Sequence, residues 1–595
     1  MPQKVEHVRT IFCEATNKDD IDLFSDKASR LTKSKIKLQF DIYHRIYNSV
    51  IPILAERMVM HLGVPRSVAM VYSRVGVINT LGLILSRTLR IQMLINEYDK
   101  EYLCIGSIRP LKVSAPSAGE IDSYARNSFE FNQSVLMDLS FAFNIPLSKK
   151  IYLSREFDFK QKNTIFTDFN FLYRLKNKIY STISRIFPRN GIPTLSMANM
   201  TNMLQGEGFY LKYLTDITSL NQIKINPFNS LVRKKIFNNL DEVMRKDVKQ
   251  LFSTIGDVHD FTFLDRMPFL LEKYFPLSLI EGSLNYKIYF DRFVSNRSKF
   301  LLSSSFGSDN DIYAIAAAKY LGIKVVNAQH GGHYGYIENI SSNEVEIPLS
   351  DIFLSWGWDG GDTLNEKKIV VLPSPWLSVR KKYWKKEDMG AQKEFDVLFM
   401  SSNITRFPFA VMSDTALTSD LAPKVFQLSK KYIDSMFDNG ARILHKPFNA
   451  AVMNIYPNLF DFQFNNTNGL YKTPVKMGKG LSRALVKKAT IVVWDNPGTG
   501  FLECIACGIP TIVLWSGYSD ITIESTPIFN ELEKVGVIHR EIESAIIETL
   551  QAIKDIQYWM NNSKRKAAIS EFSNKFALTS DDWSKSWKDF LNDVH

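Results

Sequence analysis

Histidine and glycine residues lie together in the segment Gln329-His330-Gly331-Gly332-His333-Tyr334-Gly335, which directly follows an apolar run. An imidazole gains or loses a proton near neutral pH, so His330 could act as a general base, an acid or an anion partner. Paired glycines let a backbone approach a ligand closely. We predict that His330 is catalytic; an ordinary turn with satisfied polar side chains is the alternative. The neighbours predicted to bind substrate are Gln329, Gly331, Gly332 and Tyr334.

A second polar group, Asn496-Pro497-Gly498-Thr499-Gly500-Phe501-Leu502-Glu503, follows another apolar run. Small residues at the start of a helix leave backbone N–H groups and the positive end of the helix dipole open to a phosphate. Glu503, one turn further on, could accept hydrogen bonds from ribose hydroxyls. An ordinary helix cap at Thr499 is the alternative, and the segment matches neither a Walker motif nor a complete G-x-G-x-x-G. The residues predicted to hold the phosphate are Asn496, Gly498 and Thr499.

Two further polar groups follow apolar runs, at Ser401-Ser402-Asn403 and at His445-Lys446-Pro447. His445 and Lys446 would supply cationic donors beside a rigid turn, which suits a phosphate. The hydroxyl groups of Ser401 and Ser402 could line the same site. A surface turn and a solvated loop are the alternatives for these two groups.

Carboxylates near the first motif are candidates for a catalytic base or nucleophile. Asp309 and Asp311 precede an Ala-rich segment, and one of them would also serve as a helix cap. Glu338 follows the glycine-rich loop, where a surface position is the alternative. Cys504 and Cys507 have redox spacing, but their apolar helical setting favours packing. No set of residues has metal-ligand spacing, so we predict no metal site.

Alternating strand and helix patterns must position these groups. Strands are predicted over 299–304, 324–328, 352–356 and 368–372, with an Ala-rich helix over 311–321. A second series follows, with strands over 395–400, 442–444, 490–494 and 510–515 and helices over 419–438 and 501–507. Strand–helix–strand units of this length imply parallel sheets. Since ligands bind beyond the carboxyl ends of such strands, the polar groups predict one site between two domains.

The resulting fold class is α/β, with two Rossmann-like domains and additional helices at both ends. A basic linker is predicted over 373–392, and residues 150–240 show no clear pattern. The predicted units are a helical segment over 1–100, a Rossmann-like acceptor domain over 101–375, a Rossmann-like nucleotide-sugar domain over 391–525 and C-terminal helices over 526–595.

Composition narrows the class of protein. Of 595 residues, 45% are hydrophobic and 23% are charged, which excludes wholesale disorder. The net charge of +11 admits nucleic acid, an anionic membrane face or an anionic substrate as partner. No nucleic-acid module is present in the sequence, which disfavours the first. The most apolar run, 75–86, is too short to span a bilayer, no secretory signal is visible and cysteines are few; we expect a cytoplasmic protein.

Six segments in chain order resemble a family of bacterial O-antigen and surface-polysaccharide transferases. The matching segments are 43–56, 275–281, 329–335, 354–358, 499–503 and 508–512. The resemblance implies the GT-B glycosyltransferase architecture, in which a carboxylate placed like Glu503 often holds the donor ribose. The C-terminal half is also similar to enzymes that use CMP-activated ulosonic acids such as Kdo.

These observations predict a metal-independent glycosyltransferase of surface-polysaccharide biosynthesis. Its donor would be a CMP-activated ulosonic or nonulosonic acid, its acceptor a glycan or a lipid-linked glycan, and it would need no further cofactor. The basic surface would favour peripheral contact with the inner membrane. The alternatives are an enzyme resembling CDP-polyol phosphotransferases, whose members also carry Gln-His-Gly, and a non-catalytic assembly protein with the same fold.

Overall fold

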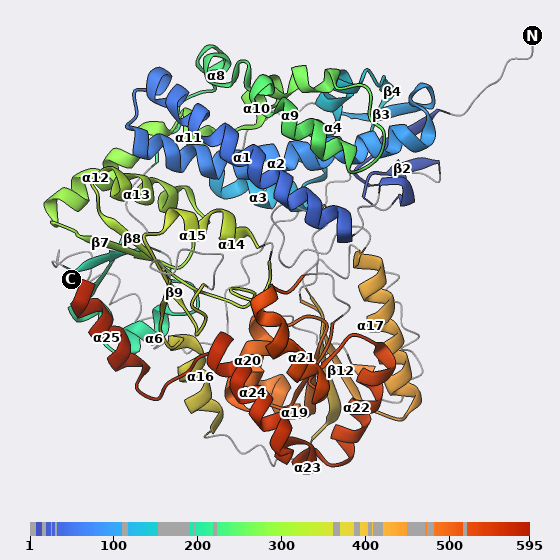
Figure 1. Cartoon of the computed structure of the whole chain (residues 1–595), viewed down its shortest axis with the longest axis vertical. Coiled ribbons are helices and arrows are strands. Elements are labelled where there is room, and N and C mark those ends of the chain that lie inside the picture. Colours follow the sequence, from blue (N-terminus) through green and yellow to red (C-terminus); the bar gives the residue numbers. More distant parts are fainter. Residues whose placement is uncertain are drawn as a thin grey trace, which may run out of the picture.

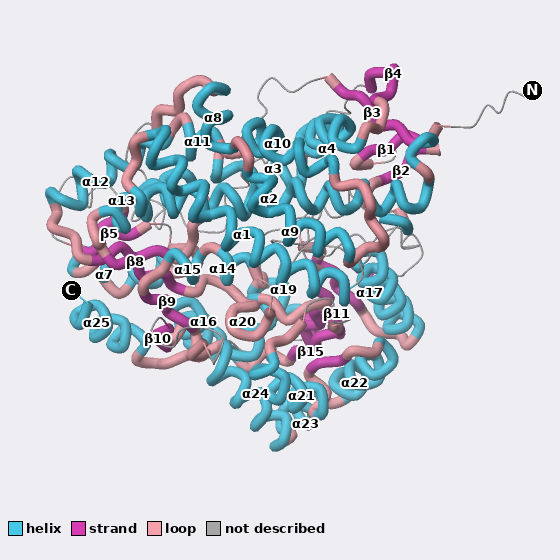
Figure 2. Tube along the Cα trace, turned by 45° about the horizontal axis from the view of Figure 1, so that its top comes forward, coloured by secondary structure: helices cyan, strands magenta, loops and turns pink. Residues whose placement is uncertain are grey.

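The molecule contains three parallel β-sheets, each covered by helices (Figures 1 and 2). This architecture confirms the predicted α/β class with Rossmann-like sheets. The computed structural model describes residues 8–14, 19–24, 26–29, 33–109, 117–152, 191–195, 197–217, 223–338, 340–360, 369–385, 393–402, 407, 421–448, 471–472, 481–515 and 520–594. Of the residues in the two shorter polar groups, Asn403 lies outside these ranges and Pro447 lies within them.

The first sheet has the strand order β2-β1-β3-β4 and is a correction to the expected helical segment over 1–100. Its strands are β1 (Arg9–Phe12), β2 (Asp20–Asp22), β3 (Leu103–Ile108) and β4 (Leu147–Tyr152). The two N-terminal strands are only four and three residues long, so they carry no periodic signal. β1 pairs with β3, in which every residue is buried, and β2 pairs with β1 at the edge of the sheet. This sheet also adds a third parallel unit to the two that the sequence predicts.

Two long helices, α1 (Lys33–Leu62) and α2 (Arg66–Tyr98), lie side by side across the N-terminal part (Figure 1). Both contribute to one large hydrophobic core that also includes β1, β3 and α13 (Asp309–Tyr320). Among the described helices, α2 alone is long and apolar enough to cross a membrane. However, 83% of its most apolar window is buried inside the molecule, as in a core helix.

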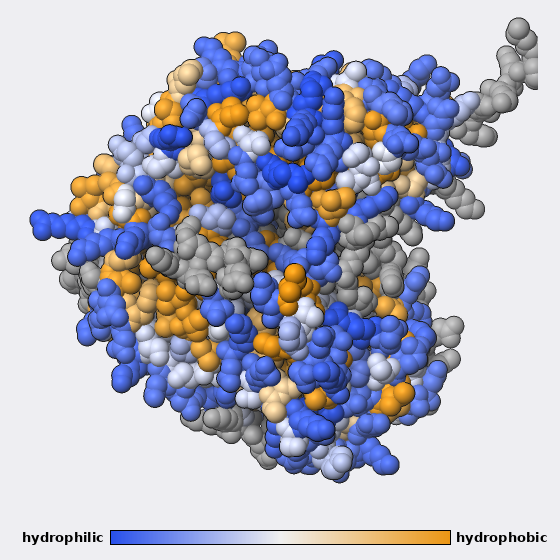
Figure 3. Space-filling view, viewed as in Figure 1, coloured by the Kyte–Doolittle hydropathy of each residue, from blue (hydrophilic) through white to orange (hydrophobic). Residues whose placement is uncertain are grey.

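The second sheet has the order β10-β9-β8-β7-β5-β6. Its strands are β5 (Ile192–Thr194), β6 (Leu214–Asp216), β7 (Phe300–Ser303), β8 (Lys324–Ala328), β9 (Ile352–Ser355) and β10 (Ile369–Val371). The last helix, α25 (Trp583–Val594), returns to this sheet and buries Trp583, Trp587 and Leu591 against it. Hydrophobic residues gather around α25 on the face seen in Figure 3, whereas hydrophilic residues dominate much of the remainder.

The third sheet has the order β13-β12-β11-β14-β15-β16. Its strands are β11 (Phe395–Met400), β12 (Ile443–Lys446), β13 (Tyr471–Lys472), β14 (Ala489–Trp494), β15 (Thr511–Leu514) and β16 (Ile538–His539). Alternate residues of β11 enter two different cores. Val397 and Phe399 pack with α17 (Leu421–Asp438) and α22 (Ile542–Lys554), while Leu398 and Met400 pack on the other face. Burial on both faces explains the continuous apolar strands.

The expected linker over 373–392 is partly a helix, α16 (Pro375–Lys385), which packs on α20 (Thr499–Cys507). Proline is well tolerated at the first helical position, because the N–H it lacks would have no partner there. Trp384 is buried in the core of the third sheet. This segment is therefore a structural element that joins the second sheet to the third.

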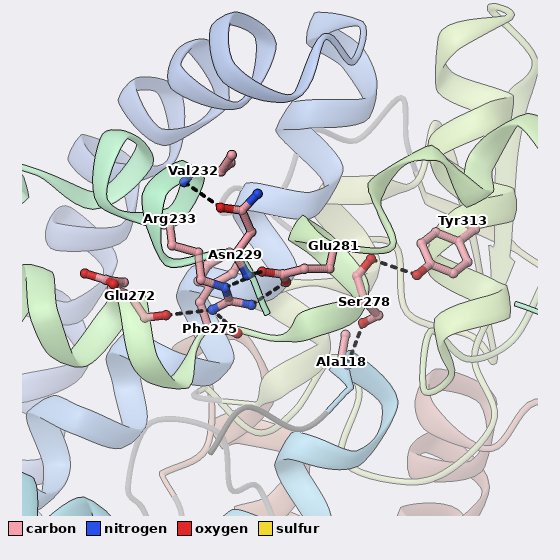
Figure 4. Close-up of polar contacts among 9 residues, drawn as sticks. All are labelled: Ala118, Asn229, Val232, Arg233, Glu272, Phe275, Ser278, Glu281 and Tyr313. Carbon is pink, nitrogen blue, oxygen red and sulfur yellow. Dashed lines mark hydrogen bonds and ion pairs between the residues drawn. The ribbon is translucent and has the colours of Figure 1, made fainter. Parts of the chain in front are cut away.

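A buried ion pair organises the segment 275–281, where one part of the family resemblance lies (Figure 4). Arg233 of α8 (Ser230–Phe237) donates to both carboxylate oxygens of Glu281, at 2.8 and 2.7 Å. Ser278 accepts a hydrogen bond from the backbone N–H of Ala118 with its hydroxyl oxygen and one from the Tyr313 hydroxyl with its carbonyl oxygen. The segment thus anchors α8, α13 and the start of α3 (Ala118–Asn127) to one another.

Candidate functional site

The loop that follows β8 meets the start of α20, so the carboxyl edges of the second and third sheets face each other. The backbone N–H of Gly332 donates to the hydroxyl of Thr499 at 2.8 Å. A Cβ on Gly332 would lie 2.7 Å from the Thr499 nitrogen and 2.8 Å from the Gly498 carbonyl carbon. Only glycine permits this approach, which explains why the predicted loop needs it. A short antiparallel bridge between Ile337 and Ile521 extends the contact.

Tyr336 holds the two sides of the site in register. Its hydroxyl accepts from the backbone N–H of His333 at 2.7 Å and donates to the Pro497 carbonyl at 2.6 Å. His333 has a positive φ of 76°, a conformation that non-glycine residues seldom adopt. Its ring lies beside Gly498, where a Cβ would be 3.4 Å from the imidazole Cε1. His333, which was not among the predicted site residues, therefore lies beside the start of α20.

His330 takes part in a chain of polar contacts with Tyr334 and Glu346. The Tyr334 hydroxyl donates to Glu346 Oε2 at 2.7 Å and lies 3.0 Å from His330 Nδ1. Since the hydroxyl has one proton and gives it to the carboxylate, its oxygen accepts from the Nδ1–H of His330. The neutral ring then carries its lone pair on Nε2, which is the form that a general base requires.

Gln329, predicted to bind substrate, is fully buried and holds the loop in place. Its Oε1 accepts from the Trp356 backbone N–H at 2.9 Å and from Trp358 Nε1 at 2.8 Å. Its Nε2 donates to the carbonyl of Gly331 at 2.8 Å. With these groups engaged, Gln329 positions the glycine pair.

His445 and Lys446 are the last two residues of β12, which runs two residues beyond the predicted strand, and both side chains are buried. His445 Nε2 lies 2.6 Å from the Ser401 hydroxyl. Burial lowers the pKa of His445 to about 3, so the expectation of a cationic His445 is wrong for the unliganded site. The reason is desolvation, which the sequence does not reveal.

Burial lowers the pKa of Lys446 to about 8, and no carboxylate among the described residues raises it again. A lysine that remains largely protonated at pH 7 thus lies at the carboxyl edge of the sheet, with its charge unneutralised by the described residues. Buried charges are almost always paired. An anionic ligand would supply the missing charge.

Asp495, which the sequence analysis did not select, joins the loops after β11 and β14. Its carboxylate accepts from the Ser402 backbone N–H at 2.8 Å and from the Ser402 hydroxyl at 2.5 Å. Asn496 donates to the same hydroxyl. Burial raises the pKa of Asp495 to about 6. Its position directly after a strand was the available signal.

Gly498 is the N-cap of α20 and provides no capping side chain, so the first N–H groups of the helix lack that partner. Glu503, one turn later, is buried and its Oε1 accepts from Arg380 Nε at 2.5 Å and from Trp384 Nε1 at 3.3 Å. Burial raises the pKa of Glu503. Its ribose-binding role stays a prediction, and Arg380, in the expected linker, has no sequence signal that links it to Glu503.

The remaining carboxylates have structural partners. Asp311 completes a capping box with Ser308, and burial raises its pKa to about 6. Asp309 accepts from the Gly119 backbone N–H at 3.2 Å. Glu338 pairs with Lys37 at 3.0 Å. Their catalytic roles stay predictions. In the described ranges, no group of three or more His, Cys, Asp or Glu side chains is arranged to hold a metal ion.

Comparison with models of known protein families identifies the family of this chain. The model of the LIC12162 family transferases matches residues 13–591. The chain belongs to this family of transferases. No curated protein matches it.

Two solved structures resemble this transferase at low identity. UDP-GlcNAc 2-epimerase from Methanocaldococcus jannaschii, in complex with UDP-GlcNAc and UDP, shares 11% identity over 64% of this chain and 97% of its own, with a TM-score of 0.33. MurG from Acinetobacter baumannii shares 10% identity over 68% of this chain and 99% of its own, with a TM-score of 0.31. At these values, neither likeness bears on the function of the chain.

Proposed function

We propose that this transferase is a glycosyltransferase of surface-polysaccharide biosynthesis, making O-antigen or capsule. It moves a sugar from a nucleotide-sugar donor, a CMP-activated ulosonic or nonulosonic acid, to a glycan or lipid-linked acceptor. The donor assignment draws on the family resemblance. We place its action in the cytoplasm, with peripheral contact to the inner membrane through its net positive charge.

The burial of the Lys446 cation is the observation that carries this proposal. Lys446 is a buried cation at the carboxyl edge of a parallel sheet, where nucleotides bind in such folds. The uncapped start of α20 offers backbone N–H groups from the neighbouring strand end. Together they suit the phosphate of a nucleotide.

In the proposed reaction, an acceptor hydroxyl attacks the anomeric carbon of the donor sugar. His330 Nε2 takes the hydroxyl proton, while the bond from the anomeric carbon to the phosphate oxygen breaks and its electron pair leaves with CMP. Lys446 stabilises the charge that grows on the departing phosphate. The Nδ1 contact with Tyr334 keeps the lone pair of His330 on Nε2.

Thermal-shift titration with CMP, CDP, UDP and GDP tests the donor, because a ligand of the native state raises the unfolding midpoint. A shift with CMP, absent in Lys446→Met, is the expected result. A shift of the midpoint with CDP alone would favour an enzyme resembling CDP-polyol phosphotransferases. A shift with UDP or GDP would replace the CMP donor, and no shift at all would overturn the nucleotide site and favour an assembly protein.

A further inference from the structure

The segment 224–231, which leads into the first turn of α8, carries large apolar side chains on the surface of the molecule. All eight of its residues are exposed to solvent. Three of them, spaced three residues apart, are Ile225, Phe228 and Leu231, which are 39%, 43% and 72% exposed. Single apolar side chains on a surface are ordinary, whereas a group of them marks a surface that contacts a partner.

Hydrogen bonds hold this segment against the buried ion pair and its neighbours. The backbone N–H of Lys224 donates to Asn285 Oδ1 at 3.2 Å, and its carbonyl accepts from Asn285 Nδ2 at 2.8 Å. The backbone N–H of Asn229 donates to Glu281 Oε1 at 3.0 Å, on the same carboxylate that Arg233 binds (Figure 4). The apolar side chains are therefore presented by an anchored loop.

Two more exposed apolar side chains lie beside this segment. Leu284, which precedes Asn285, is 51% exposed, and Met60, in the last turn of α1, is 75% exposed. One turn before Met60, Arg57 donates to the carbonyl of Ile236 in α8 at 3.1 Å, so this end of α1 lies against α8. Figure 3 shows hydrophobic side chains in orange at the upper edge of the molecule, over α8 of Figure 1.

The charges around these apolar side chains are positive. The sequence has no Asp or Glu over residues 217–240. One acidic neighbour from another segment is Glu272, which is only partly exposed, and the charge of Lys234 opposes the rise that burial causes in its pKa. Four exposed lysines, none of which forms an ion pair within the described ranges, are Lys224, Lys234, Lys235 and Lys287.

We propose that these side chains form a docking surface for a lipid bilayer with anionic headgroups. This surface, the α8 patch, comprises the four lysines together with Ile225, Phe228, Leu231, Leu284 and Met60. The apolar side chains enter the boundary between headgroups and acyl chains, while the lysines stay beside the anionic headgroups. A second copy of the chain would set lysines against lysines, and a nucleic acid would leave the apolar side chains uncovered. That the patch brings the enzyme to a lipid-linked acceptor rests on the proposed function; membrane binding itself does not.

Co-sedimentation with vesicles tests the α8 patch. The probes are vesicles of phosphatidylcholine alone and of phosphatidylcholine with phosphatidylglycerol, each at low and at high salt. We expect the protein to bind the vesicles that contain phosphatidylglycerol, more weakly at high salt, and to bind pure phosphatidylcholine about tenfold less or weaker still. Leu231→Glu, and separately Lys234→Gln combined with Lys235→Gln, should each weaken binding to the anionic vesicles about tenfold or more.

Matched controls make the same chemical changes elsewhere on the surface. Ile547→Glu removes an apolar side chain that is 57% exposed on α22. Lys564→Gln combined with Lys566→Gln removes two exposed lysines of α24 (Ser563–Phe576), so the loss of net charge equals that of the α8 variant. Both controls should keep full vesicle binding. Because Leu231 is largely exposed, Leu231→Glu should leave the unfolding midpoint and the thermal shift with CMP unchanged.

The proposal is overturned if the protein does not bind the anionic vesicles, or if Leu231→Glu binds them as tightly as Ile547→Glu does. A protein that self-associates without vesicles and becomes monomeric in Leu231→Glu would show instead that the α8 patch is an interface between copies. The CMP titration reports separately on the proposed function. A protein that binds vesicles through the α8 patch but shifts with no nucleotide would retain the membrane surface and lose the glycosyltransferase assignment.

Discussion

The backbone N–H of Gly332 donates to the side-chain oxygen of Thr499 at 2.8 Å, and this contact makes one site out of two sheets. Gly332 follows β8 with His330, while Thr499 opens α20 next to Gly498. The loop after β8 and the start of α20 pack against each other, so each forms one side of the site. The predicted base and the predicted phosphate site are therefore fixed relative to each other.

Gly332→Ala should separate these loops. The added Cβ would lie 2.7 Å from a backbone nitrogen, which cannot move aside as a flexible side chain could. We expect a loss of transferase activity of at least tenfold and a lower unfolding midpoint. Gly206→Ala is the control, since a Cβ there meets nothing within 4 Å. Normal turnover in Gly332→Ala would contradict the importance of the close approach.

Lys446→Met should stabilise the protein at pH 7 while it abolishes nucleotide binding. The pKa of Lys446 falls from 10.5 to about 8, which corresponds to roughly 3 kcal/mol against folding when the lysine is protonated. Because the folded pKa is the lower one, this penalty is complete below pH 8 and disappears as the pH rises toward 10.5. Urea unfolding should show that Lys446→Met stabilises the protein less at pH 10 than at pH 7. An equal stabilisation at both pH values would contradict this prediction.

In the protein that retains Lys446, loss of the Lys446 proton should weaken CMP binding above pH 8. Deprotonation of Lys446 removes the charge that the phosphate meets, although a bound phosphate moves the loss to a higher pH. Affinity for CMP measured from pH 6.5 to 9.5 should fall at the alkaline end. Lys446→Met, which should not bind CMP at any pH in this range, is the negative control. A flat profile would show that Lys446 does not contact the phosphate.

His330→Asn should lower kcat by about 10²–10⁴-fold, the usual contribution of a general base. Tyr334→Phe keeps an aromatic ring at position 334 but removes the hydroxyl that accepts from the Nδ1–H of His330. A smaller fall in kcat, of about tenfold, is expected. Neither substitution should change the thermal shift with CMP. The kcat of each variant is measured by steady-state kinetics with a CMP-sugar donor. An unchanged kcat in His330→Asn would exclude it as the base.

Glu503→Gln should destabilise the fold by about 3 kcal/mol, because it leaves the Arg380 charge largely buried without its carboxylate. The double variant Arg380→Met with Glu503→Gln should recover most of that loss in urea unfolding. If Glu503 also holds the donor ribose, CMP affinity stays low in the double variant. Recovery of both stability and CMP binding would leave Glu503 a purely structural role.

Chelation of divalent metal should leave the reaction rate unchanged. In the proposed reaction, Lys446 and the start of α20 meet the leaving phosphate, so no metal ion is needed for that charge. The measurement is the initial rate in EDTA against the rate with added Mg²⁺. A rate that falls in EDTA and returns with Mg²⁺ would contradict metal independence.

The parts of the fold nearest the site were those the sequence predicted best. The strands β8 and β11 begin and end at the expected residues, because each is a mostly apolar run that polar groups follow. Rossmann-like units place such polar groups at one edge, and Gly332 and Thr499 meet there. Local pattern and global topology agree in these segments.

The errors arise where long-range pairing or burial decides the outcome. The strands Arg9–Phe12 and Asp20–Asp22 are too short and too charged to show alternation. The first pairs with the distant β3, and the second pairs with the first. The partnership of Arg380 with Glu503 spans 123 residues. The neutral state of His445 follows from burial beneath chain segments that no local spacing identifies.

The return of α25 to the second sheet has a consequence for synthesis of the chain on the ribosome. β8 and the His330 loop emerge long before Trp583, Trp587 and Leu591, which complete the core on one face of that sheet. Until those residues leave the exit tunnel, this face stays uncovered and is a target for chaperones. The loop that follows β8 therefore gains this support only after Leu591 has emerged, long after the residues of the loop itself.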